Sequence, residues 1–241
     1  MTQVDILAFG AHPDDVELGC GGTIALSIAQ GKTVAIVDLT QGELSTRGDV
    51  QTRKSEAKIA SDVLKIYNRE NLKLKDGFFE NNLENQLVLI EIIRKYQPNI
   101  VLCNSRRDRH IDHGKANQLV NDSCFLSGLN KIETIDQNGK NQTSWRPQLI
   151  LEYIQWNEVK PDIVINITGY LDKKIEAVRA YKSQLFNSKN NENNTPISTE
   201  NFLNSVKYRA QNLGRLIGTE AGEGFTSRQL LAIKELDSLI K

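Results

Sequence analysis

The chain has 241 residues, of which 39% are hydrophobic and 25% are charged, a balance that supports one globular domain with a buried core. Thirty basic and thirty acidic residues give a formal net charge of +0 at pH 7, which excludes the strongly basic surface of a nucleic-acid-binding protein. No apolar stretch approaches the roughly 18 residues of a membrane-spanning helix, and residues 1–5 lack the basic start of a secretory signal, so we expect a cytoplasmic protein without a membrane partner.

Runs of apolar and β-branched residues alternate along the chain with segments of helical spacing. In chain order they predict a strand at 5–11, a helix at 23–30, a strand at 33–39, a helix at 50–66, a strand at 72–74, a helix at 84–96, a strand at 100–104, a helix at 112–125, strands at 148–154 and 163–167, and helices at 170–185 and 228–240. An Asn-rich stretch at 187–199 predicts an exposed loop. This order favours a single domain over residues 1–241, with a Rossmann-like, mostly parallel α/β sheet and helices on both faces.

Small residues near the first helix predict packing rather than ligand binding. Gly19, Gly21 and Gly22 come too late for a dinucleotide-binding loop, and His12-Pro13-Asp14-Asp15 occupies the position where that loop would bind a pyrophosphate. Close contact between the helix and the sheet explains these glycines better. The three cysteines, Cys20, Cys103 and Cys124, form no CxxC pair, so we expect small buried side chains rather than a disulfide or a thiolate metal site.

All three histidines lie in two loops that follow predicted strands. The first loop, Ala11-His12-Pro13-Asp14-Asp15, follows the strand at 5–11, and the second, Asp108-Arg109-His110-Ile111-Asp112-His113, follows the strand at 100–104. Because ligands of parallel α/β sheets bind beyond the carboxyl ends of the strands, we expect both loops to meet at that edge.

Two imidazoles and a carboxylate are suitable ligands for a divalent, zinc-like ion. His12, Asp15 and His113 supply this set, and a catalytic zinc site needs about three protein ligands with one position left for water. Zinc is the expected ion, and Fe(II) or another divalent ion suits the same ligands.

The remaining polar residues of these loops are candidates for proton transfer. We expect Asp14 to accept a proton from the bound water, and His110 to protonate the leaving group or to stabilise a developing oxyanion. Asp112 is expected to orient an imidazole, that of His110 in particular; the alternative is that Asp112 caps the following helix.

The paired motifs AHPDD and DRHIDH resemble those of the LmbE-like, or PIG-L, family of zinc-dependent N-acetylglucosaminyl deacetylases. The segments Thr46-Arg47-Gly48, Arg53 with Glu56, and AVRAYKSQ at 177–184 are most similar to the deacetylases of bacillithiol biosynthesis. The resemblance implies the LmbE-like fold, the metal ligands and the general base named above, and substrate contact for Arg53. It also implies a homo-oligomer, a trimer or a hexamer. Arg47, at the same sheet edge, is a second candidate for substrate binding, and the stretch 221–225 resembles a segment at the rim of the family's active site.

These observations favour hydrolysis of the N-acetyl group of an amino sugar, and the resemblance implies N-acetylglucosaminyl-malate as the small-molecule substrate. Another N-acetylglucosaminide or a chitin-like oligosaccharide is an alternative. A phosphoesterase would need two metal ions about 3.5–4 Å apart and therefore more ligands. A non-catalytic sugar-binding protein would have no use for Asp14 and His110.

Overall fold

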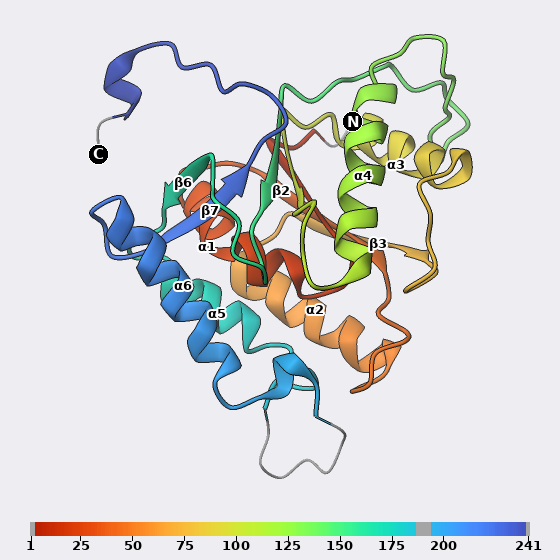
Figure 1. The fold of residues 1–241 in the computed structure, drawn as a ribbon. Coiled ribbons are helices and arrows are strands. Elements are labelled where there is room, and N and C mark those ends of the chain that lie inside the picture. The colour runs from red at the N-terminus through yellow and green to blue at the C-terminus, as the bar shows by residue number, and fades with distance from the viewer. Residues whose placement is uncertain (1–2, 187–193, 240–241) are drawn as a thin grey trace.

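The computed structural model describes residues 3–186 and 194–239. Seven strands form one sheet in the order β3-β2-β1-β4-β5-β7-β6. Helices surround this sheet (Figure 1). The elements are β1 (Ile6–Gly10), α1 (Asp15–Ala29), β2 (Val34–Thr40), α2 (Val50–Leu64), β3 (Asn68–Leu74), α3 (Leu83–Tyr96), β4 (Ile100–Asn104), α4 (Ile111–Leu126), β5 (Leu149–Tyr153), β6 (Ile163–Asn166), α5 (Leu171–Val178), α6 (Phe202–Leu216) and β7 (Gly222–Thr226), with short 3₁₀ helices at Pro196–Ser198 and Leu236–Leu239.

The sheet is mostly parallel, as the sequence predicts. The strands β1 to β5 pair in parallel, while β7 runs antiparallel to both β5 and β6. The parallel strands β1 and β2 are buried throughout because helices cover both faces of the sheet.

Successive side chains of a strand point to opposite faces, and β1 divides its residues between two cores accordingly. Leu7 and Phe9 belong to the core that α3 and α4 cover, through residues such as Leu89 and Leu119. Ile6 and Ala8 belong to the opposite core, to which α1, α2 and α5 contribute. The prediction of an α/β sheet with helices on both faces is therefore confirmed.

The glycines of α1 permit the close helix–sheet contact that the sequence predicts. A Cβ atom on Gly19 would lie 2.1 Å from Cδ2 of Tyr153, and one on Gly22 would lie 2.6 Å from Cδ1 of Ile167. The helix is interrupted at Cys20, and the carboxylate of Glu223 accepts hydrogen bonds from the backbone N–H groups of Gly22 and Thr23 in the turn that follows. All three cysteines are buried and free.

The C-terminal third departs most from the sequence prediction. The helix expected at 170–185 ends at Val178, and the helix α6 and the strand β7 were not predicted. The helix expected at 228–240 is wrong: the described part is irregular apart from the short 3₁₀ turn, and Leu230 is 98% exposed, so its apolar spacing finds no surface to pack against. The expected loop at 187–199 lies partly outside the described residues.

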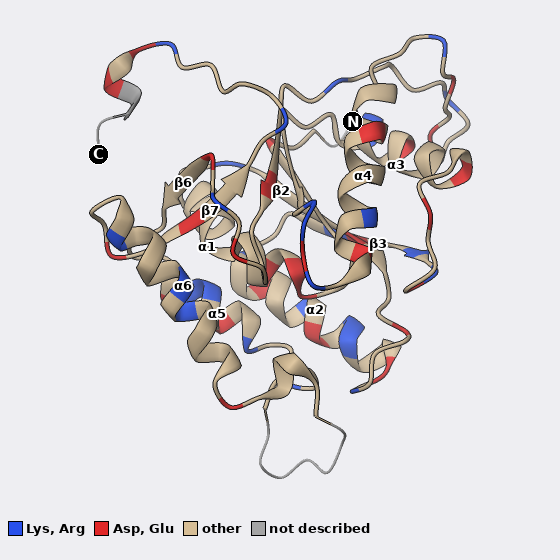
Figure 2. Ribbon diagram, in the orientation of Figure 1, with Lys and Arg blue, Asp and Glu red and all other residues tan. Residues whose placement is uncertain are grey.

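Two elements, α1 and β3, begin earlier in the chain than the sequence predicts. The helix α1 begins at Asp15 rather than at residue 23, and β3 covers Asn68–Leu74 rather than 72–74. None of the described helices is long and apolar enough to cross a membrane. Acidic and basic residues are interspersed along the ribbon (Figure 2).

Candidate active site

The two histidine loops meet at the carboxyl edge of the sheet, as expected. His12 follows β1, whereas His110 and His113 lie at the start of α4, which follows β4. The ring centroid of His12 lies 5.7 Å from that of His113 and 4.6 Å from that of His110. One ligand atom from each of the three rings lies within 4.8 Å of the others.

Asp15 lies between two of the imidazoles and faces each with a different oxygen. Its Oδ2 lies 3.5 Å from Nδ1 of His12, and its Oδ1 lies 3.2 Å from Nε2 of His113. The side-chain amides of Asn104 and Gln155 donate hydrogen bonds to the same carboxylate. Burial would raise the pKa of Asp15, but the two imidazoles hold it well below its usual range. Asp15 is therefore a carboxylate in a fixed orientation.

The outer nitrogen of each of these two imidazoles faces a second carboxylate. Nε2 of His12 lies 3.0 Å from Oδ1 of Asp76, and Nδ1 of His113 lies 2.9 Å from Oδ2 of Asp108. An outer carboxylate holds the proton of the neutral imidazole on the outer nitrogen, and this leaves the inner lone pair free for a metal. The inner nitrogens are the two that face Asp15.

The charge balance of this cluster also fits a cation. Burial would lower the pKa of His12, but the carboxylates of Asp112, Asp15 and Asp76 raise it well above its ordinary value. Burial would likewise lower the pKa of His113, but the carboxylates of Asp15 and Asp108 outweigh burial and raise this pKa to about 9. The carboxylates thus stabilise positive charge among the rings, which a divalent ion would supply in place of the protons.

Asp112 faces a different imidazole from the one expected. Its Oδ2 lies 3.4 Å from Nε2 of His12 and accepts a hydrogen bond from the N–H of Gly77, so its carboxylate faces His12 rather than His110. The helix cap is also a different residue: α4 begins at Ile111, and Nδ1 of His110 accepts a hydrogen bond from the N–H of Asp112. The start of the helix turns the Asp112 side chain inward, toward the first loop.

Asp14 is buried beside the cluster in a strained backbone conformation. Its φ of 118° lies in a region that L-residues rarely adopt, which indicates that the loop constrains it strongly. Burial raises its pKa to about 7, against the opposing charge of Arg53. A carboxylate with a pKa near neutrality can both accept and release a proton at physiological pH.

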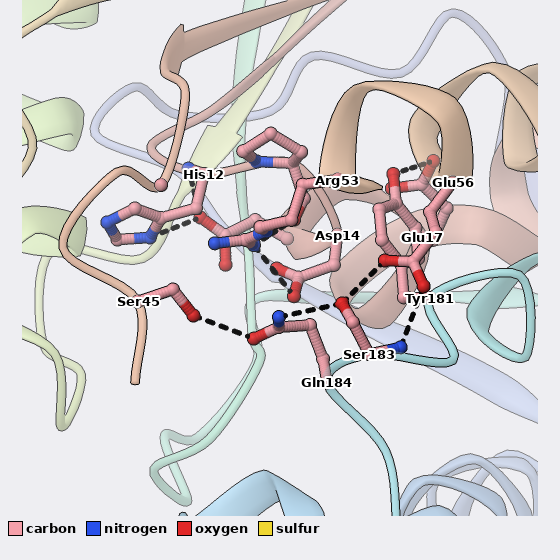
Figure 3. A network of polar contacts seen from close by, with 12 residues as sticks. His12, Asp14, Glu17, Ser45, Arg53, Glu56, Tyr181, Ser183 and Gln184 are labelled. Carbon is pink, nitrogen blue, oxygen red and sulfur yellow. Dashed lines mark hydrogen bonds and ion pairs between the residues drawn. The ribbon is translucent and has the colours of Figure 1, made fainter. Parts of the chain in front are cut away.

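Arg53 contacts the first loop directly. Its Nη2 donates to Oδ2 of Asp14 at 3.1 Å and to the carbonyl oxygen of Pro13 (Figure 3). The resemblance implied substrate contact for Arg53; in the structure its guanidinium holds the candidate base. Glu56 faces away from Arg53 and accepts hydrogen bonds from the N–H and the hydroxyl of Ser183.

Arg47 lies outside the lining of the pocket. Its side chain is 2% exposed, and its backbone carbonyl accepts a hydrogen bond from Nε2 of Gln184. The same Gln184 accepts a hydrogen bond from the hydroxyl of Ser45, so it ties the loop after β2 to the segment after α5 (Figure 3). Arg47 therefore belongs to a loop whose shape Gln184 fixes, and Gln184 itself lines the pocket.

The cluster opens into a pocket of about 420 Å³, a size suited to a small molecule. Its lining combines the histidines and carboxylates with apolar residues that include Trp156, Ile197 and Phe202. Sequence reasoning missed Asp76 and Asp108 as partners of the imidazoles. Asp108 belongs to the second motif, and Asp76 follows β3 at the same sheet edge. The rule that ligands bind beyond the carboxyl ends of parallel strands therefore applied to both residues.

Fold and site together define a Rossmann-like α/β protein with a histidine–carboxylate cluster at the carboxyl edge of its sheet. The PIG-L family model, described as GlcNAc-PI de-N-acetylase, matches residues 7–124, which include both histidine loops. This match agrees with the resemblance of the two motifs to the PIG-L, or LmbE-like, family.

Three individual proteins extend the similarity beyond the matched segment. Diacetylchitobiose deacetylase of Thermococcus kodakarensis is 27% identical over 74% of this chain and 69% of its own length. The solved structure of the conserved protein TT1542 from Thermus thermophilus has a TM-score of 0.84, is 29% identical, and covers 96% of this chain and 98% of its own. The chain is also 24% identical to 4-oxalmesaconate hydratase of Pseudomonas putida, over 76% of this chain and 74% of that protein.

Proposed function

We propose that the protein is a metal-dependent deacetylase that hydrolyses the N-acetyl group of an N-acetylglucosaminide. The observation that carries the proposal is the pair of imidazoles, His12 and His113, whose outer nitrogens are held by carboxylates and whose inner nitrogens face Asp15, with Asp14 buried beside them. The family match and the diacetylchitobiose deacetylase relative support the same reaction class.

His12, Asp15 and His113 would hold the ion, and zinc is the proposed metal. The bound ion would supply Lewis acidity toward the acetyl carbonyl and would lower the pKa of an attached water. Asp14 would take a proton from the water that attacks the carbonyl carbon, and the contact with Arg53 would keep the Asp14 carboxylate aimed at the pocket. As the C–N bond breaks, the departing nitrogen needs a proton, and the protonated Asp14 carries one.

In this proposal His110 would stabilise the negative charge that develops on the acetyl oxygen. Its Nδ1 accepts a hydrogen bond from the N–H of Asp112, so the neutral ring carries its proton on Nε2. Burial and the nearby rings of His12 and His113 lower the pKa of His110, which favours this neutral form. A neutral imidazole that donates from Nε2 suits an oxyanion hole, and this geometry favours that role over an acid that is charged at rest.

For the finer substrate we propose N-acetylglucosaminyl-malate, whose deacetylation would serve bacillithiol biosynthesis. The alternative is a chitin-type disaccharide, which the diacetylchitobiose deacetylase relative supports. The expected homo-oligomer is a further part of the proposal, and light scattering on the same samples measures it.

The test incubates metal-loaded protein separately with N-acetylglucosaminyl-malate, diacetylchitobiose and free N-acetylglucosamine, and measures acetate and free amine. We expect equal amounts of acetate and amine, fastest from the malate glycoside. A faster reaction with diacetylchitobiose would replace the malate assignment and keep the reaction class. Absence of acetate from all three would contradict the proposed function.

Hydration of a carbon–carbon double bond is the second candidate, because the hydratase relative covers most of this chain. Adding 4-oxalmesaconate to the same protein and following the loss of its ultraviolet absorbance separates the two reactions. We expect no change in absorbance, since the candidate base and oxyanion donor are arranged for hydrolysis of an amide.

A further inference from the structure

Two arginines, Arg53 and Arg109, line the pocket within the described part of the chain. The guanidinium of Arg53 is already engaged by Asp14 and by the carbonyl of Pro13. The side chain of Arg109 forms no ion pair with any residue that the structure describes, and it is exposed at the pocket. Among the described residues, the guanidinium of Arg109 therefore has no counter-ion, and it faces the space where the substrate would bind.

Arg109 is held in place by an aromatic stack. Its guanidinium carbon lies 4.7 Å from the centroid of the Trp156 ring, a distance typical of a cation–π contact. Trp156 in turn stacks on Phe202, with centroids 5.9 Å apart and an interplanar angle of 18°. Arg209 donates a hydrogen bond of 2.7 Å to the carbonyl oxygen of Trp156, which fixes the backbone beneath the ring.

The same segment is connected to the proposed metal ligands. Asp108, which contacts Nδ1 of His113, also accepts hydrogen bonds from the N–H groups of Arg109 and Asn157. A connected group of contacts, rather than a free loop, therefore sets the distance between the histidine–carboxylate cluster and the Arg109 guanidinium. This arrangement suits recognition of a charge at a fixed distance from the scissile bond.

We propose that Arg109 binds an anionic group, a carboxylate or a phosphate, on the part of the substrate that is attached to the amino sugar, and that Trp156 is its positioning residue. The inference rests on the proposed function and names the substrate class for it. A guanidinium presents its donors in a planar fork that matches either group, and the pre-organised contact with Trp156 reduces the ordering that binding requires.

The test compares kcat/KM for a carboxylate-bearing glycoside (N-acetylglucosaminyl-malate), a phosphate-bearing one (N-acetylglucosamine 1-phosphate) and a neutral one (the methyl glycoside). Arg109→Gln should lower the ratio of anionic to neutral kcat/KM by about tenfold to a hundredfold, since a hydrogen bond between charged groups is lost. The matched control is Arg107→Gln, which removes an equal charge from an exposed side chain of the same loop. The control should leave the ratio of anionic to neutral kcat/KM unchanged. In the wild type, the anionic glycoside with the larger ratio to the methyl glycoside identifies the preferred group, carboxylate or phosphate.

Trp156 is tested by rescue. Trp156→Ala should lower the same ratio through a higher KM for the anionic glycoside, whereas Trp156→Phe, which retains an aromatic face, should restore most of it. A purely structural role would instead change the kinetics of all three glycosides together.

Binding by calorimetry to the Asp14→Asn protein separates this inference from the proposed function. The anionic glycoside should bind more tightly than the methyl glycoside, and adding Arg109→Gln should remove the difference. If no acetate is released from any glycoside, the proposed function fails while this binding comparison still decides the inference. Equal effects of the Arg109 and Arg107 variants, or no preference for the anion in binding, would overturn it.

Discussion

Asp14 is the single residue whose surroundings differ most from those of an ordinary carboxylate. It is buried, its backbone is held at a φ of 118°, and it faces both Arg53 and the histidine cluster. Burial raises its pKa to about 7 in the protein without metal. These features separate Asp14 from its neighbour Asp15, whose carboxylate is held between two imidazoles.

Replacing the proposed base tests this division between the two carboxylates. Asp14→Asn keeps the shape of the side chain but cannot accept a proton, so kcat should fall by about 10²- to 10⁴-fold. Metal content, measured by mass spectrometry of the digested protein, should stay equal to that of the wild type, because the proposed ligands are untouched. Activity within tenfold of the wild type would exclude Asp14 as the base.

The charge of Arg53 should be visible in the pH dependence of the reaction. Arg53 lowers the pKa of Asp14, and the base works only when ionised, so kcat/KM should rise with pH through the pKa of Asp14. Arg53→Gln should move this acid limb to higher pH. Lys54→Gln removes the same charge from the next, exposed residue of α2 and should leave the limb in place. An acid limb at the same pH in the wild type and in Arg53→Gln would contradict the assignment of this limb to Asp14.

The sequence predicted that the loops of His12, Asp14, Asp15 and His113 converge. The order of the strands, together with the rule that ligands bind beyond the carboxyl ends of parallel strands, sufficed for this prediction. It did not predict which imidazole Asp112 faces. That choice depends on where α4 begins and on side-chain orientation, and neither is encoded in the spacing of the motif. Asp76 was missed because its loop carries no recognisable motif.

At the scale of elements, the close contact between α1 and the sheet constrains the position of the first loop. Tyr153, buried in β5, packs against Gly19 and donates a hydrogen bond from its hydroxyl to the carbonyl oxygen of Phe9 in β1. Both ends of this tyrosine are fixed, so its ring has little freedom to move. Asp15, at the start of the same helix, takes its place in the cluster from this packing.

Two glycines of α1 offer a matched pair of substitutions. Gly19→Ala would place a Cβ atom 2.1 Å from the Tyr153 ring and should destabilise the fold by about 1–3 kcal/mol or more. At Gly21 the nearest atom to such a Cβ lies at 3.4 Å, an ordinary contact, so Gly21→Ala should stay within about 1 kcal/mol of the wild type. Denaturant unfolding measures both, and equal stabilities would contradict the packing.

The elements that the sequence misplaced depend on tertiary contacts. The strand β7, Gly222–Thr226, contains two glycines and has weak strand propensity, but its position between β5 and β6 supplies pairing on both sides. The helix α6 buries Phe202, Val206 and Ala210 against the body of the protein, although Asn and Ser within it are poor helix formers. The predicted helix at 228–240 had suitable spacing but lacked such a surface.

At the scale of the whole molecule, metal binding and protonation compete for the same imidazoles. The carboxylates raise the pKa of His113 from 6.5 to about 9 in the metal-free protein. The stability that this shift contributes is fully present below pH 6.5 and is lost as the pH rises through 9. A metal ion, which binds the neutral ring, gains affinity over the same range.

The difference in Tm between metal-loaded and chelator-treated protein should therefore widen between pH 6 and pH 8.5. Thermal unfolding at fixed free metal concentration measures this difference, and a His113→Gln variant should reduce it at every pH. A difference that narrows as the pH rises would show that the ion does not displace protons from these rings.

The position of the ion is the most direct test of the account, because His12 belongs to two groups of donors. Its Nδ1 faces Asp15, whose other oxygen faces His113, and its Nε2 faces Asp76 and Asp112. Anomalous diffraction from crystals grown with zinc would locate the metal. We predict one peak per chain, shared by His12 Nδ1, Asp15 and His113 Nε2; a peak at Nε2 of His12, between Asp76 and Asp112, would contradict the proposed ligand set.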